Sequence, residues 1–288
     1  MIAAVITLQF RYAEELSDLG WLHAANMCVQ WIWFICFFGC LFCSPGYAID
    51  SMNNEKGSST YDEALSVIAS DFTGVESGKM KLCHSCHVRR PLRAKHDQFL
   101  RKCVHKFDHH CPFVGNTIGR DNHRFFLGLT VIHQFCFFLF LTTSIYFARR
   151  VYCSWSLIAW LLYSFMWDLM MMGLGSYHLQ LCLTNMTTNE SVGIAKYDYL
   201  LDPTTGQFDN PFCRGSTMGN LMDVLMPYKD FFFYRDDVIK FINRKGPGLR
   251  IGKGPSEHSS RGYSGHSHGH SHGHGHNDYS APLMRHQN

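Results

Sequence analysis

The chain has 288 residues, a formal net charge of +3 and a mean hydropathy of −0.11, an average typical of a soluble protein. That average hides long apolar blocks beside polar stretches, and aromatic residues make up 15% of the chain. The blocks indicate a membrane protein rather than a wholly soluble one. The twelve cysteines argue against a disulfide framework, because many lie in apolar runs where cysteine acts as a small hydrophobic residue. Four others share a basic polar segment, which indicates a reducing, cytosolic environment.

Three apolar segments are long enough to cross a bilayer, which requires about 20 residues. We predict transmembrane helices over residues 21–43, 125–148 and 155–183. Residues 1–20 open with a shorter apolar run, and we expect a truncated span or an interfacial segment there. Asp168 lies inside the third span, where an acid is costly and is expected to face the bundle interior. It is either a functional residue or a polar contact between helices.

Polar segments join and follow these spans. Residues 44–78 are predicted to be a linker with a short helix, 79–124 a Cys-rich domain, and 184–244 a C-terminal region. The tail, residues 245–288, is rich in His and Gly and is predicted to be disordered. Nine Lys or Arg residues and one acid lie between Lys79 and Phe107. Because basic loops stay on the inner side of a membrane, the linker, the Cys-rich domain and the C-terminal region are expected in the cytosol.

The Cys-rich segment contains a set of residues with the spacing of metal ligands. Cys83 and Cys86 form a C-x2-C pair, which is half of a tetrahedral zinc site. His96 and Cys103 follow in the same segment and are expected to complete the site. A small basic segment with few apolar residues could hardly fold without a metal. The pattern therefore predicts a structural zinc site.

A second group, Asp108-His109-His110-Cys111, has a different chemistry. A thiol reacts as the thiolate, so it needs a base or a positive field nearby. His109 lies two residues from Cys111 and can take its proton, and Asp108 can hold the imidazole in the correct tautomer. We therefore predict Cys111, His109 and Asp108 as catalytic residues.

These residues carry a specific resemblance to the DHHC-type protein S-acyltransferases, or palmitoyltransferases. The resemblance extends over roughly residues 21–235 and is most similar to the ankyrin-repeat-bearing subgroup, although the chain contains no such repeat. The matching motifs are Arg90-Pro91-x-Arg93-x-x-His96, Asp108-His109-His110-Cys111-Pro112, Gly119-x-x-Asn122-x-x-Phe125-Phe126 and Thr187-Thr188-Asn189-Glu190, with Ser44-Pro45-Gly46 and Asn210-Pro211-Phe212 as weaker matches.

The resemblance implies both a fold and an activity. The implied fold is an all-α transmembrane helical bundle with a small zinc-stabilised cytosolic Cys-rich domain of short β-hairpins and loops. The implied enzyme works in two ping-pong steps: Cys111 takes a long-chain acyl group, palmitoyl, from acyl-CoA as a thioester, and a cytosolic cysteine of a substrate protein then displaces it. Its partners would be acyl-CoA, cysteine-containing proteins at the cytosolic membrane face, and the bilayer, without nucleic acid. The expected location is the Golgi or related endomembrane vesicles.

The chain departs from the family pattern at one place. The family usually binds two zinc ions, and the four positions that match the first site are intact. At the second site, where Cys, Cys, His and Cys are expected, the chain has Asp97, Leu100, His110 and Thr117. We therefore expect one zinc, with His110 as the remnant of a lost second site. That loss removes a structural cross-link beside the nucleophile. The alternative to an active acyltransferase is therefore a catalytically weakened or inactive zinc-domain membrane adaptor of the same fold.

Overall fold

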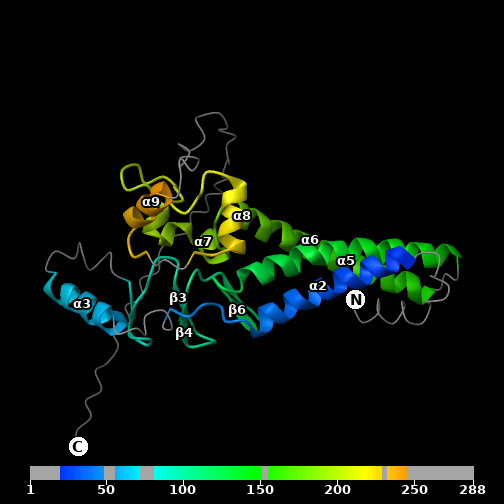
Figure 1. Cartoon of the computed structure of the whole chain (residues 1–288), viewed down its shortest axis with the longest axis horizontal. Helices are drawn as coiled ribbons and strands as arrows, with labels where there is room; N and C mark the ends of the chain where they lie inside the picture. Colours follow the sequence, from blue (N-terminus) through cyan, green and yellow to red (C-terminus); the bar gives the residue numbers. More distant parts are fainter. Residues whose placement is uncertain (1–19, 49–55, 72–80, 151–154, 229–231, 245–288) are drawn as a thin grey trace, which may run out of the picture. The chain divides into compact units, whose positions relative to one another are not determined.

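The structure is a computed structural model that describes residues 20–48, 56–71, 81–150, 155–228 and 232–244 (Figure 1). The helices and strands carry the labels of that figure. The expectations for residues 1–19 and for the tail, residues 245–288, lie outside the described residues.

Three helices are long and apolar enough to cross a membrane: α2 (Gly20–Phe42), α5 (His123–Arg150) and α6 (Trp155–Leu183). They match the three segments that were predicted to be spans, with ends that differ by at most two residues. In the bundle, α5 packs against both α2 and α6 (Figure 1). The chain is an integral membrane protein.

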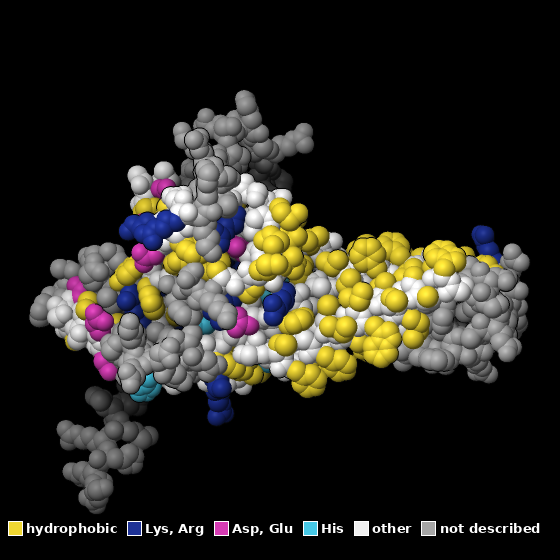
Figure 2. Space-filling model, in the orientation of Figure 1, with side chains coloured by type: hydrophobic (Ala, Val, Ile, Leu, Met, Phe, Trp, Pro, Cys, Tyr) yellow, Lys and Arg dark blue, Asp and Glu magenta, His cyan; other side chains and the backbone are white. Residues whose placement is uncertain are grey.

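The surface of this bundle suits lipid rather than water. Figure 2 shows hydrophobic side chains spread over the visible face of the bundle. Large apolar residues such as Trp31, Phe38, Leu162 and Met166 are exposed on it. An apolar surface of this extent marks contact with a membrane, since soluble proteins rarely expose large contiguous apolar patches.

Polar side chains of the bundle lie in its interior instead. His133 Nε2 on α5 is 2.9 Å from Asp168 Oδ1 on α6, and both residues are buried. Asp168 therefore faces the bundle interior, as the sequence indicated. Of the two readings of this acid, the structure supports the polar contact between helices, because its carboxylate is used to join α5 to α6.

The Cys-rich segment folds as three antiparallel β-hairpins, which confirms the predicted fold class. The hairpins pair β1 (Leu82–Cys83) with β2 (Val88–Arg89), β3 (Lys95–Asp97) with β4 (Lys102–Val104), and β5 (His109–Cys111) with β6 (Asn116–Ile118). Isolated two-stranded hairpins are marginally stable at best, so other contacts must hold them.

The third hairpin is fastened to the end of a membrane helix. The side-chain N–H groups of Asn116 donate to the backbone carbonyls of Cys40, Leu41 and Cys43, at 2.9, 3.3 and 3.1 Å. These carbonyls end α2, where no further turn of helix can satisfy them. Cys111 packs in a small core with residues of α2 and α5, namely Cys40, Phe126 and Leu129. The hairpin that carries the thiol is thus seated at the ends of two spans.

The remaining elements are short helices. They are α3 (Lys56–Ser70), α7 (Thr188–Val192), η2 (Ile194–Lys196), η3 (Asp198–Leu200), α8 (Thr217–Leu225) and α9 (Arg235–Arg244). Helix α3 falls within the linker that was expected to hold a short helix, and it contacts β2. Helix α8 packs against α5 and α6 (Figure 1).

A buried ion pair ties α7 to the Cys-rich segment. Arg93 donates to both carboxylate oxygens of Glu190, from Nε at 2.8 Å and from Nη2 at 2.7 Å, and both side chains are almost fully buried. Glu190 also accepts from the backbone N–H of Thr187 at 2.9 Å, which completes a capping box at the start of α7. One carboxylate therefore fixes the helix to its cap and to a segment far away in the sequence.

We predict that Arg93→Met lowers the free energy of unfolding by about 3–5 kcal/mol, because it leaves the Glu190 carboxylate buried without its cation. The measurement is denaturant unfolding of the purified protein in mild detergent. The matched control is Lys81→Met, which breaks a mostly exposed ion pair with Asp198 and should cost at most about 1 kcal/mol. Equal effects of the two substitutions would contradict this account.

Candidate functional site

Four metal-binding side chains come together between the first two hairpins. Cys83 ends β1, Cys86 lies in the turn that follows, and His96 lies opposite Cys103 in the β3–β4 pair. His96 Nδ1 is 3.4 Å from Cys83 Sγ, 3.2 Å from Cys86 Sγ and 4.0 Å from Cys103 Sγ. All four donor atoms lie within 4.8 Å of one another.

This cage fits a zinc ion by both chemistry and size. Three sulfurs and one imidazole nitrogen are a usual donor set for structural zinc. A tetrahedral zinc with ordinary bond lengths separates its ligand atoms by roughly 3.5–3.8 Å, close to the spacing found here. The four predicted ligands are therefore brought together, and they can hold a metal.

The predicted catalytic residues also form one connected group. Asp108 precedes β5 and is 1% exposed, and its Oδ2 lies 2.6 Å from His109 Nδ1. The His109 imidazole lies close enough to the Cys111 thiol for each group to shift the pKa of the other. His109 and Cys111 are two residues apart on one short strand, so their side chains lie on the same face of the hairpin. The result is an acid, an imidazole and a thiol in sequence.

Thr188 at the start of α7 holds the acid of this group. Its backbone N–H donates to Asp108 Oδ1 at 2.7 Å, and its hydroxyl donates to Asp108 Oδ2 at 2.8 Å. The Thr187-Thr188-Asn189-Glu190 motif signalled that this stretch matters, but no role was predicted for Thr188. The contact joins positions 80 residues apart, so only the tertiary structure shows it.

These contacts set the charges of the acid and the imidazole. Burial by itself would raise the pKa of Asp108, but the hydrogen bonds from His109 and Thr188 hold that pKa well below its usual range. Burial would likewise lower the pKa of His109, but its contacts with the Asp108 carboxylate and the Cys111 thiol raise it to about 9. The Asp108 carboxylate is therefore charged, and it favours an imidazolium beside the thiol.

The same arrangement favours the thiolate. Burial alone would raise the pKa of Cys111, but the His109 imidazole and the backbone N–H groups of Val114 and Phe113 bring that pKa below its ordinary value. A thiolate beside an imidazolium is a nucleophile ready for attack on a carbonyl carbon. The group can therefore accept an acyl group.

Two further side chains line this group from the membrane helices. Phe126 on α5 meets the His109 ring edge-on, with ring centroids 5.0 Å apart, and meets the His178 ring of α6 in the same way at 4.8 Å. His178 Nδ1 lies 3.9 Å from Asp108 Oδ2. The sequence noted His178 only as a histidine near the end of a span, and nothing in its surroundings pointed to the Cys-rich segment.

Comparison with known proteins agrees with this geometry. Residues 76–194, which hold both the cage and the thiol, match the family model described as DHHC palmitoyltransferase. These residues form a DHHC palmitoyltransferase domain. The resemblance drawn from the motifs is thereby confirmed.

Three relatives illustrate the match. The chain is 31% identical over 172 residues to "Palmitoyltransferase ZDHHC17" of Danio rerio, covering 51% of this chain and 27% of the relative. It is 32% identical over 159 residues to "Probable protein S-acyltransferase 5" of Arabidopsis thaliana, covering 51% and 31%. It is 31% identical over 159 residues to "Palmitoyltransferase ZDHHC9" of Bos taurus, covering 51% and 42%. The match thus spans less than half of the length of each of these relatives.

The four positions expected to match a second zinc site, Asp97, Leu100, His110 and Thr117, do not form a cluster of metal-binding side chains in the described part of the chain. Among the described residues, the cage of Cys83, Cys86, His96 and Cys103 is the one group of three or more Cys, His, Asp or Glu side chains close enough to hold a metal. His110 instead lies with its Nδ1 2.9 Å from the hydroxyl of Thr117. It points away from the face that carries His109 and Cys111, since neighbouring residues of a strand alternate.

We predict that Asp108→Asn slows alkylation of Cys111 by iodoacetamide at pH 7 and moves the midpoint of its pH profile upward. The sign follows from the charges: without the carboxylate the His109 imidazolium is less stable, so the thiolate loses its cation and the pKa of Cys111 rises. The measurement is the alkylation rate between pH 5 and 10, resolved at Cys111 by mass spectrometry.

The control for this experiment is Asp237→Asn, which removes an exposed acid in α9 and should leave the profile unchanged. An unshifted midpoint in Asp108→Asn would show that the carboxylate does not support the thiolate.

Proposed function

We propose that the chain is a protein-cysteine S-palmitoyltransferase that works through an acyl-enzyme thioester on Cys111. The observation that carries the proposal is the ordered group of Asp108, His109 and Cys111 inside a DHHC domain seated at the ends of membrane helices. The substrates proposed are long-chain acyl-CoA and cytosolic cysteines of proteins at the membrane face.

In the first step the Cys111 thiolate attacks the thioester carbonyl of acyl-CoA. The bond between that carbonyl and the CoA sulfur breaks, and the leaving CoA thiolate takes the proton held by the His109 imidazolium. In the second step His109 accepts the proton of a substrate cysteine. The resulting thiolate attacks the acyl group on Cys111, which leaves as the thiolate that began the cycle. Asp108 remains ionised throughout and orients the imidazole.

This chemistry asks little of the protein beyond placement. One thioester replaces another in each step, so the bond energies nearly balance. The protein contributes a thiolate, a positioned base and an apolar environment for the acyl chain. Cys111 packs directly against residues of α2 and α5, and Phe113 just beyond it is 76% exposed. These features support a nucleophile at the bilayer surface with the acyl chain directed along the spans.

The proposed zinc has a structural part in this scheme. Held by Cys83, Cys86, His96 and Cys103, it would cross-link the first two hairpins and would supply folding energy rather than chemistry. The side chains of Asp108, His109 and Cys111 perform the reaction without it.

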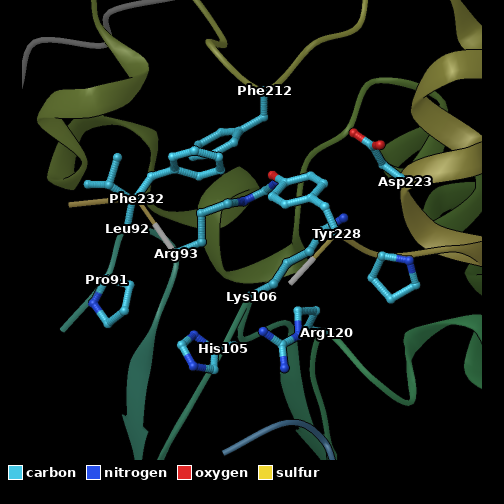
Figure 3. Close-up of a pocket in the computed structure, with 11 residues that line it drawn as sticks. Pro91, Leu92, Arg93, His105, Lys106, Arg120, Phe212, Asp223, Tyr228 and Phe232 are labelled. Carbon is cyan, nitrogen blue, oxygen red and sulfur yellow. The ribbon is translucent and has the colours of Figure 1, made fainter. Parts of the chain in front are cut away.

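A basic groove supports acyl-CoA as the co-substrate. A small cavity of about 30 Å³, with Arg93, Lys106 and Arg120 among its lining residues (Figure 3), has room for little more than a water molecule. A groove of about 600 Å³ lies beside it, in the size range of ligand sites. Its lining includes six basic side chains, four aromatic ones and two acids: Lys81, Arg89, Arg90, Arg93, Lys196 and Arg235, with Tyr197, Tyr199, Phe233 and Tyr234, and Asp198 and Asp236.

The groove suits the phosphates and the purine of CoA by charge and by stacking surface. It reaches Asn189, the neighbour of Thr188, which contacts Asp108. Arg90 Nε and Arg89 Nη2, on two of the lining residues, are buried without a hydrogen-bond acceptor.

The proposed setting is the cytosolic face of the Golgi or related vesicles. The basic Cys-rich segment favours the cytosol, where reduced thiols persist for both the cage and the reaction. The alternative of an inactive adaptor gains no support from the geometry, because Asp108, His109 and Cys111 stay connected although the second zinc ligands have been replaced.

We predict that the purified protein forms a hydroxylamine-labile acyl adduct with palmitoyl-CoA and that Cys111→Ser abolishes it, because the hydroxyl of serine is not ionised by His109. The measurement is acyl labelling of the protein in detergent, with Cys28→Ser, an exposed span cysteine, as the matched control. A labile adduct that persists in Cys111→Ser would show that the nucleophile is another residue. No adduct on the unaltered chain would favour the adaptor.

We predict one tightly bound zinc per chain, measured by elemental analysis of the purified protein. Cys86→Ser should lower the zinc content well below one and destabilise the fold, since a structural zinc site supplies folding energy. Cys213→Ser, a half-buried cysteine outside the cage, should leave it at one. Two zinc ions per chain would mean that residues near His110 bind a second metal.

A further inference from the structure

The third hairpin presents two faces with different tasks. His109 and Cys111 lie on the face of the reaction, and His110 between them lies on the opposite face. His110 is opposite Thr117 in the register of β5 and β6, and Cys111 is opposite Asn116. A hairpin with strands of three residues has little rigidity of its own, so the placement of Cys111 depends on what holds that opposite face.

A chain of hydrogen bonds joins the His110 face of the third hairpin to the second hairpin. The hydroxyl of Thr117, which is fully buried, donates to Asp97 Oδ2 at 2.5 Å. Because its one hydrogen is used there, its oxygen must accept from His110 Nδ1–H in the 2.9 Å contact between them. Asp97, Thr117 and His110 thus form a continuous bridge from β3 through β6 to β5.

Both ends of this bridge are fixed. Asp97 is 3% exposed, and its carboxylate also accepts from the backbone N–H groups of Phe99 and Leu100, at 3.3 and 3.2 Å. The Phe99 ring stacks on the His110 ring with centroids 4.0 Å apart and planes 12° from parallel. The stacked ring covers the imidazole, which shields the bridge from water and strengthens its hydrogen bonds.

The bridge therefore runs between the metal cage and the nucleophile. Asp97 follows His96, a residue of the cage, and His110 precedes Cys111. One end of the bridge is therefore adjacent in sequence to a residue of the metal cage, and the other end is adjacent to the nucleophile. A displacement of a nucleophile by about 1 Å can slow a reaction by about a hundredfold. A structural link this close to Cys111 can therefore affect the rate of its reaction.

We propose that the Asp97–Thr117–His110 bridge is a positioning device for Cys111, which fixes the hairpin of the nucleophile to the hairpin of the metal cage without a metal ion of its own. This rests on the proposed function of Cys111 as the acyl acceptor. Thr117 and His110 act through the placement of Cys111 and take no part in proton transfer.

The test removes the hydroxyl and keeps the shape. Thr117→Val should lower kcat for acyl-adduct formation from palmitoyl-CoA by about tenfold or more, with KM for palmitoyl-CoA and the zinc content unchanged. Thr117→Ser restores the hydroxyl and should recover kcat to within about twofold. The matched control is Thr143→Val in α5, whose hydroxyl donates only within its own helix, to Leu139 O. It should behave as the unaltered chain.

A second variant covers the case in which Thr117→Val does not fold. His110→Phe keeps an aromatic ring against Phe99 and removes the Nδ1–H donor, and it should reproduce the loss in kcat. An unchanged kcat in the folded variant, a loss that Thr117→Ser fails to recover, or a loss confined to KM would each overturn the proposal.

Alkylation separates this proposal from the proposed function. If the unaltered chain forms no acyl adduct, the proposed function fails, but the reaction of Cys111 with iodoacetamide still reports on the thiol. The bridge then predicts slower alkylation of Cys111 in Thr117→Val than in the unaltered chain at pH 7, because a displaced thiol loses its contact with His109. Equal alkylation rates would overturn the bridge.

Discussion

The buried carboxylate of Asp108 is the contact on which the arrangement of the site depends. A charge that is 1% exposed is costly unless hydrogen bonds satisfy it, and here His109 and Thr188 both donate to it. These two donors belong to different parts of the chain, the third hairpin and helix α7. Both of these hydrogen-bonding partners are present only when the two parts are in place, so the site is complete only when helix α7 is docked.

Helix α7, which supplies Thr188, is itself held in place by buried polar contacts. Helix α7 has five residues and cannot be stable alone, since isolated short helices are marginal in water. Its capping box and the Arg93–Glu190 pair hold it, and its first residue then meets Asp108. A buried ion pair is a weak source of net stability, but breaking it is expensive. Its value here is in fixing one arrangement of α7, and through Thr188 one orientation of the acid.

The membrane helices complete the site by geometry rather than by charge. The ends of α2 and α5 supply the apolar packing around Cys111, and Asn116 satisfies the carbonyls that end α2. The hairpin of the nucleophile is therefore held on three sides: by α2 and α5 through packing and Asn116, by α7 through Asp108, and by the second hairpin through the Asp97–Thr117–His110 bridge. Hydrogen bonds and a stacked ring join the residues at the positions where ligands of a second zinc were expected.

The features of this protein that could be predicted are those whose signals lie close together in the sequence. The spans follow from runs of apolar residues, because bilayer thickness sets their length. The metal cage could be predicted from C-x2-C and a nearby His and Cys. The catalytic residues could be predicted because Asp108, His109 and Cys111 lie within four consecutive positions. The pairings across long separations could be found only from the folded chain: Thr188 with Asp108, Glu190 with Arg93 at a separation of 97 residues, and Asp168 with His133. A residue pattern shows that such polar groups need partners once buried, but the choice of partner depends on which elements the fold brings together.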